Sequence, residues 1–150
     1  MKLSQKQIYD IAQTLDTGLL CYIHKKTGEV RDMITDEMAE MGGVEEEHRA
    51  DMEVIEKEPD KWVLIEPMMS GDAFSIMEDF ADQVGNRGLQ KRLIGTLNGR
   101  RPFANFKNAV DNSDEREDWF EFKQKGYEAW VRRELRHNFE MYDENMDSDE

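Results

Sequence analysis

The chain of 150 residues has almost none of the features that mark secreted or membrane proteins. Its single cysteine, Cys21, excludes an internal disulfide bond and is typical of a reducing compartment. No apolar run approaches the roughly 18 residues that a membrane span needs. The opening segment, MKLSQKQIYD, has no apolar stretch behind its lysines and does not have the pattern of a signal peptide. We therefore expect a cytoplasmic protein with no membrane partner.

The chain also lacks the motifs of common enzymes. No P-loop, dinucleotide-binding fingerprint or nucleophile elbow occurs in it. The three histidines are scattered: His24, His48 and His137. Cys21 lies within a predicted strand, where a small buried residue is its usual role. The acidic run at 45–51 is typical of a solvated helix face, because adjacent acids do not converge on one point. We expect no catalytic residue, no metal site and no cofactor.

Positive charge is scarce overall and unevenly placed. The formal net charge is -14, yet residues 86–110 hold six basic side chains and no acidic one. Residues 1–85 hold 8 basic and 20 acidic side chains, and residues 111–150 hold 6 basic and 14 acidic. A basic island over residues 86–110 thus separates two acidic arms. Acidic arms repel nucleic acid, so the island is the part of the chain that would attract an anion.

The first half predicts a helix followed by a small antiparallel sheet. Ser4 and Gln7 have the spacing of a capping box that begins a helix over residues 5–15. Three segments have the β-branched and aromatic residues of short strands: residues 18–25, 29–34 and 61–66. The first two form a hairpin, and the third adds to it. Between them, residues 45–58 predict a loose acidic helix that Pro59 ends.

The second half predicts only helices. Apolar residues recur at helical spacing over residues 72–84, 88–97, 102–111 and a long helix capped by Ser113. Phe103 and Phe106 lie within a basic stretch, where aromatic rings can stack on bases, but their spacing is more typical of two core residues. Arg132 lies near the end of the long helix, where the helix dipole favours cations. Gly126 costs that helix about 1 kcal/mol relative to alanine, so we expect close packing there.

These elements predict an α+β fold. It comprises a small three-stranded antiparallel sheet with an N-terminal helix, followed by a helical C-terminal half of about four helices. The length predicts one domain over residues 1–141, and the composition predicts a mobile acidic tail over 142–150.

A series of motifs in the second half supports this organisation. They are Ile65-Glu66-Pro67, Met77-Glu78-Asp79-Phe80, Arg92-Leu93, Gly99 with Pro102-Phe103, Phe106-Lys107, Trp119 with Phe122, and Trp130. Their order resembles that of the bacterial uncharacterised protein family 0158 over roughly residues 53–136, with a weaker match at 18–34. The resemblance implies a related fold and no activity, because the family has no established biochemical role. The family has arginine where this chain has Ala104, so the resemblance supports no basic function there.

The strongest candidate site is the segment Arg100-Arg101-Pro102. Proline suits the first position of a helix, and the start of a helix already carries partial positive charge. Two cations placed there are unfavourable by about 0.3–1 kcal/mol each unless an anion lies between them. Two interpretations stay open: a salt bridge with one of the 34 acidic residues of the chain, or an external anion.

Other cations extend this site. The predicted binding residues are Arg100, Arg101, Lys107, Arg92 and Lys91. Because Lys91 and Arg92 are adjacent, they point about 100° apart on a helix. We expect a non-catalytic interaction or regulatory module that engages an anionic ligand or an acidic protein partner. The alternatives are a nucleic-acid-binding protein that uses the same island, and an enzyme whose arginines clamp an anionic substrate. The sequence determines neither the partner nor the oligomeric state.

Overall fold

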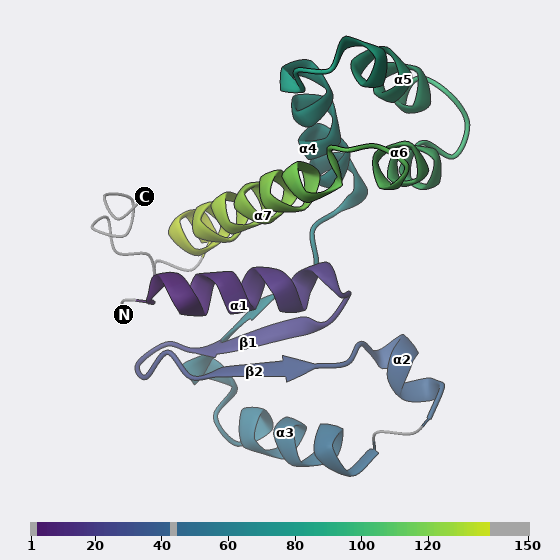
Figure 1. Cartoon of the computed structure of the whole chain (residues 1–150). Helices are drawn as coiled ribbons and strands as arrows, with labels where there is room; N and C mark the ends of the chain where they lie inside the picture. Colours follow the sequence, from purple (N-terminus) through teal and green to yellow (C-terminus); the bar gives the residue numbers. More distant parts are fainter. Residues whose placement is uncertain (1–2, 43–44, 139–150) are drawn as a thin grey trace. The chain divides into compact units, whose positions relative to one another are not determined.

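The computed structural model describes residues 3–42 and 45–138, and these residues divide between two compact units (Figure 1). Unit 1 comprises Met1–Pro67 and Tyr127–Glu150, and unit 2 comprises Met68–Gly126. The helix α7 (Arg116–Asn138) begins in unit 2 and ends in unit 1. The single domain expected over residues 1–141 stays a prediction, and the expected acidic tail lies outside the described residues.

Unit 1 is built on a three-stranded antiparallel sheet with the order β2-β1-β3. The strands are β1 (Leu20–His24), β2 (Val30–Met33) and β3 (Trp62–Ile65). In the central strand, Cys21 is paired with Asp32 on β2 and with Ile65 on β3. This register confirms both the predicted hairpin and the third strand that adds to it.

Helices lie on both sides of this sheet (Figure 1). α1 (Gln5–Asp16) begins at the predicted capping box, in which the Ser4 hydroxyl accepts a hydrogen bond from the Gln7 N–H at 3.1 Å. Its buried residues are Ile8, Ile11, Ala12 and Leu15. On the other side, Ile55 of α3 (Glu45–Lys57) packs with Met33 and Trp62. The short helices α2 (Asp36–Glu40) and η1 (Pro59–Lys61) connect the other elements of unit 1.

The second half of α7 completes unit 1 through a buried polar link to α1. The Gln5 amide donates to the Glu128 carboxylate at 2.6 Å and accepts a hydrogen bond from the Arg132 guanidinium. Glu128 and Arg132 are both buried, although charged residues rarely are unless they have partners. The sequence placed Arg132 only near the end of the long helix, because its partner on α1 is 127 residues away.

Unit 2 contains α4 (Ser70–Gln83), α5 (Arg87–Leu97), α6 (Pro102–Asp111) and the first part of α7. Its core is aromatic: the rings of Phe80, Phe106 and Trp119 meet at centroid distances of 5.0 to 6.5 Å. The close packing predicted at Gly126 is confirmed, since a Cβ there would lie 3.1 Å from Cδ1 of Ile76. Together with unit 1, these helices confirm the predicted α+β fold.

Two local expectations in unit 2 are wrong. Phe106 is 1% exposed, but Phe103 is 44% exposed, because Phe106, Ala109 and Val110 already fill the buried side of α6. Ser113 does not cap the long helix, which begins at Arg116. Its hydroxyl donates to the carbonyl of Val110 at 2.7 Å and accepts a hydrogen bond from the N–H of Glu115 at 3.1 Å, so it holds the connection between α6 and α7.

Candidate anion-binding surface

The basic island of residues 86–110 forms α5, the turn after it and almost all of α6. α5 ends at Leu97, α6 begins at Pro102, and the two helices pack against each other within unit 2. The predicted arginine pair lies in the four-residue turn between them. The short connection therefore places both arginines beside the first turn of α6.

Arg101 holds an uncommon backbone conformation in this turn. It is the N-cap residue of α6, with φ 48° and ψ 56°, and is the one non-glycine residue with positive φ in the described part of the chain. A left-handed conformation costs an L-residue about 1–2 kcal/mol relative to the right-handed one. Glycine would avoid this cost, so the arginine side chain is kept at the expense of stability.

The start of α6 has no side-chain cap, in contrast to the start of α5. At α5, the Asn86 side chain accepts a hydrogen bond from the Leu89 N–H at 3.0 Å. Arg101 carries no acceptor, and the N–H groups of Phe103 and Ala104 meet none among the described residues. The Asn105 amide instead donates to the carbonyl of Arg100 at 2.8 Å and holds the turn. The first turn of α6 therefore keeps its partial positive charge.

The predicted binding residues are exposed and lack carboxylate partners among the described residues. This holds for Arg100, Arg101, Lys107, Arg92 and Lys91, and also for Arg87 at the start of α5. Some cations outside the island do have such partners: Lys125 pairs with Glu121 at 3.1 Å and Arg116 with Asp111 at 3.2 Å. The internal salt bridge, one of the two interpretations of the arginine pair, is thus not formed with any described residue.

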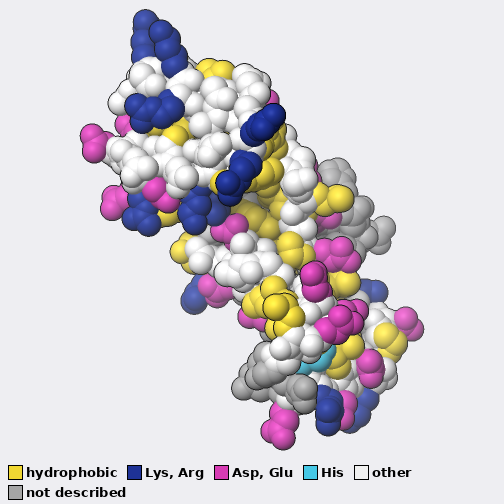
Figure 2. Space-filling model, turned by 90° about the vertical axis from the view of Figure 1, so that its right-hand side faces the viewer, with side chains coloured by type: hydrophobic (Ala, Val, Ile, Leu, Met, Phe, Trp, Pro, Cys, Tyr) yellow, Lys and Arg dark blue, Asp and Glu magenta, His cyan; other side chains and the backbone are white. Residues whose placement is uncertain are grey.

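The five predicted residues come from three places in unit 2. Figure 2 shows Lys and Arg side chains in several separate groups on one face of the molecule. Arg100 and Arg101 share the turn, Lys107 lies in the second turn of α6, and Lys91 and Arg92 lie on α5. The group centred on the turn therefore defines the candidate surface.

Sequence reasoning missed Phe103 as a residue of this surface. Its ring meets that of Phe74 at a centroid distance of 6.3 Å, and much of it remains exposed. Phe103 also lies one helical turn before Lys107, so both share one side of α6. The available signal was its place in the first turn, directly beside two arginines.

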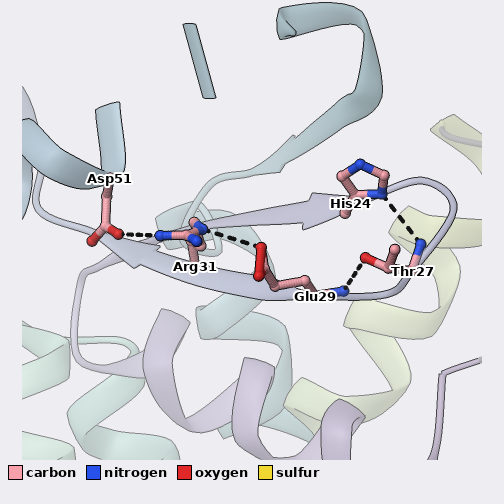
Figure 3. Close-up of polar contacts among 5 residues, drawn as sticks. All are labelled: His24, Thr27, Glu29, Arg31 and Asp51. Carbon is pink, nitrogen blue, oxygen red and sulfur yellow. Dashed lines mark hydrogen bonds and ion pairs between the residues drawn. The ribbon is translucent and has the colours of Figure 1, made fainter. Parts of the chain in front are cut away.

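The polar side chains of the hairpin serve local structure (Figure 3). Nδ1 of His24 accepts hydrogen bonds from the N–H groups of Lys26 at 3.1 Å and Thr27 at 3.2 Å. Arg31 pairs with Glu29 at 3.2 Å and with Asp51 of α3 at 2.6 Å. His24 therefore holds the hairpin turn, and Arg31 joins β2 to α3.

Cys21 is buried in the sheet, which confirms its interpretation as a small buried residue. Burial raises the pKa of the thiol to about 12, and the charge of Asp32, 3.9 Å from the sulfur, contributes to the same shift. The group is therefore a neutral thiol at physiological pH, and a neutral thiol is a poor nucleophile.

Two further features considered from the sequence are a metal site and a membrane-spanning helix. Within residues 3–42 and 45–138, the described side chains include no group of three or more His, Cys, Asp or Glu that could hold a metal ion. The side chains of Glu45, Glu47 and His137 lie outside the described set. In the same part of the chain, no helix combines the length and apolar character that crossing a membrane requires.

Comparison with known proteins identifies the family to which this chain belongs. The chain matches the profile of an uncharacterised protein family (UPF0158) over residues 3–148, which includes both units. It is also similar to the UPF0158 protein PA5073 of Pseudomonas aeruginosa, with 27% identity over 79 residues. That match covers 52% of this chain and 52% of the relative, so the chain spans about half the length of the curated relative it matches. No solved structure matches the chain significantly.

The chain belongs to this uncharacterised family, as the order of its motifs predicted. The profile match extends beyond residues 53–136, where the resemblance was strongest, and takes in α1 and the whole sheet. The family name assigns no activity, so a function for this chain depends on the surface described above.

Proposed function

We propose that this protein is a non-catalytic interaction module whose basic island engages an acidic partner. One observation carries the proposal: six exposed cations lie within 25 residues, and none has a carboxylate partner among the described residues. The chain has ample acidic residues with which to pair them. Cations that remain solvated in an acidic protein are available to a carboxylate from another molecule.

The conformation of the turn supports the same surface. Arg101 keeps its side chain in a left-handed conformation, and strained residues of this kind are concentrated at functional sites. The uncapped first turn of α6 adds partial positive charge beside both arginines. An anionic group between Arg100 and Arg101 would meet cations and backbone donors together.

Binding to immobilised polyglutamate at low salt tests this function. The wild-type chain should be retained, and R100Q/R101Q should weaken retention about fivefold or more, as expected for the loss of two partly exposed ion pairs. The matched control is K25Q/K26Q, which removes two adjacent exposed lysines from unit 1. It changes the net charge equally and should leave retention unchanged.

Three results would overturn the proposal. The first is no retention of the wild type, and the second is equal weakening by both double variants. The third is a loss of stability in R100Q/R101Q without a change in retention, which would make the arginines structural. Duplex DNA on a parallel column examines the alternative function. Stronger retention on DNA, falling steeply as salt rises, would replace the acidic partner by a nucleic acid.

A further inference from the structure

Phe103 gives the candidate surface an apolar component. The ring is 44% exposed and contacts Phe74, which packs against the core of unit 2. A single exposed apolar residue is normal in a folded protein. The setting of Phe103 is unusual. Arg101 lies two residues before it, and Lys107 lies on the same side of α6 one turn later. An exposed ring fixed between solvated cations matches a ligand that is both anionic and apolar.

We infer that the partner presents an acidic peptide segment with a large apolar side chain. This inference rests on the proposed function and names the chemistry of its partner. Carboxylates of the segment pair with Arg100, Arg101 and Lys107, while the apolar side chain packs on Phe103. Any cluster of cations could bind a segment that offers carboxylates alone. The apolar contact is what makes one acidic segment bind better than another.

The charge distribution favours a peptide over a nucleic acid. Single-stranded nucleic acids bind along a continuous basic groove with several aromatic rings on which bases stack. Here the exposed aromatic rings of unit 2 are Phe103 and Phe120, and Phe103 is the one near the arginine pair in the sequence. Carboxylates also lie at the end of α6, at Asp111, and in the first turn of α7. Such a surface accommodates a few carboxylates better than a run of phosphates.

Fluorescence anisotropy of the full-length protein with two labelled peptides, DEDFDED and DEDADED, tests the inference. The wild type should bind the phenylalanine peptide about five- to tenfold more tightly. F103A should remove this preference and leave the affinity for the alanine peptide within about twofold. R100Q/R101Q should weaken both peptides. The matched control is F120A, because Phe120 is 41% exposed in unit 2 and its ring already faces Arg116 at 4.9 Å.

A second variant, K107E, tests the inference even if F103A fails to fold. K107E alters one exposed side chain and should weaken both peptides at least about threefold. The inference fails if F103A keeps the preference, if F120A removes it, or if K107E changes neither affinity. It also fails if a single-stranded heptathymidylate binds more tightly than both peptides and loses affinity in F103A. Retention on polyglutamate without any peptide preference would refute the inference and leave the proposed function in place.

Discussion

At the scale of single residues, Arg101 shows a conflict between backbone and side chain. Its positive φ is stable for glycine and costly for arginine, and its guanidinium lies at the positive end of α6. Both effects lower the stability of the native state. A residue that opposes the fold in two ways is more readily explained by binding than by packing.

Replacing Arg101 therefore separates stability from binding. We expect R101G to be more stable than R101Q by about 0.5–1 kcal/mol, because glycine relieves the left-handed strain and this gain exceeds its greater freedom in the unfolded chain. Urea unfolding measures the difference, and R101Q provides the matched loss of charge. Both variants should bind polyglutamate equally weakly. Equal stability of the two variants would show that the backbone at Arg101 is not strained.

Cys21 gives a prediction that depends on pH. Its pKa of about 12, against 9.0 for an unperturbed thiol, implies about a thousandfold less thiolate at pH 8 than in an unfolded chain. Iodoacetamide should therefore modify the native protein far more slowly than the urea-unfolded protein, as mass spectrometry can follow. Because the thiol ionises first in the unfolded state, it also favours unfolding as pH rises from about 9 towards 12. Modification of native and unfolded chains at similar rates would contradict its burial.

At the scale of elements, α7 contains a glycine, Gly126, where a larger residue would make a tight contact with α4. A Cβ at Gly126 would lie 3.1 Å from Cδ1 and 3.3 Å from Cγ1 of Ile76 on α4. Alanine would gain about 1 kcal/mol of helix propensity and lose part of it to this contact. The net effect depends on how far the end of the Ile76 side chain can move.

A double-mutant cycle measures this balance. We expect G126A to be more stabilising in the I76V background than in the wild type, because valine lacks the Cδ1 atom that the new Cβ meets. The coupling should be about 0.5 kcal/mol or more by urea unfolding, with I76V alone as the reference. Additive effects of the two substitutions would show that α4 and α7 accommodate the methyl group freely.

The sequence predicted secondary-structure elements better than it predicted other features of the fold. Ser4 and Gln7 predicted the start of α1, because a capping box satisfies backbone donors within four residues of chain. The apolar spacing predicted α4, α5 and α6 for the same local reason. Phe103 was misplaced because the side of α6 that faces the core depends on neighbours from other helices. The candidate surface was predicted as a set of cations, whereas its aromatic component was not.

At the scale of the whole molecule, the two units differ strongly in charge. Among the described residues, unit 2 holds 10 acidic and 9 basic residues, whereas unit 1 holds 18 acidic and 10 basic. Like charges repel one another within a folded unit, and added salt screens that repulsion. The excess negative charge therefore lowers the stability of unit 1 far more than that of unit 2.

Hydrogen exchange at different salt concentrations tests this difference on the unmodified protein. Sodium chloride should slow the exchange of β1 amides in unit 1 more than the exchange of α6 amides in unit 2. Mass spectrometry of peptides from both elements provides the two readings in one sample. Equal protection of both elements at every salt concentration would indicate that the units open together, as the single domain predicted over residues 1–141 requires.

The sequence by itself determined the fold class, the three strands, most of the helices and the basic island, because periodicity, caps and charge counts are local properties of a chain. Only the tertiary structure decided that the cations of the island have no described carboxylate partner, that Phe103 is exposed and that Glu128 and Arg132 are buried against Gln5. These features depend on which side chains meet across the fold. Contacts of that kind are set by the packing of distant segments, and local pattern carries no record of them.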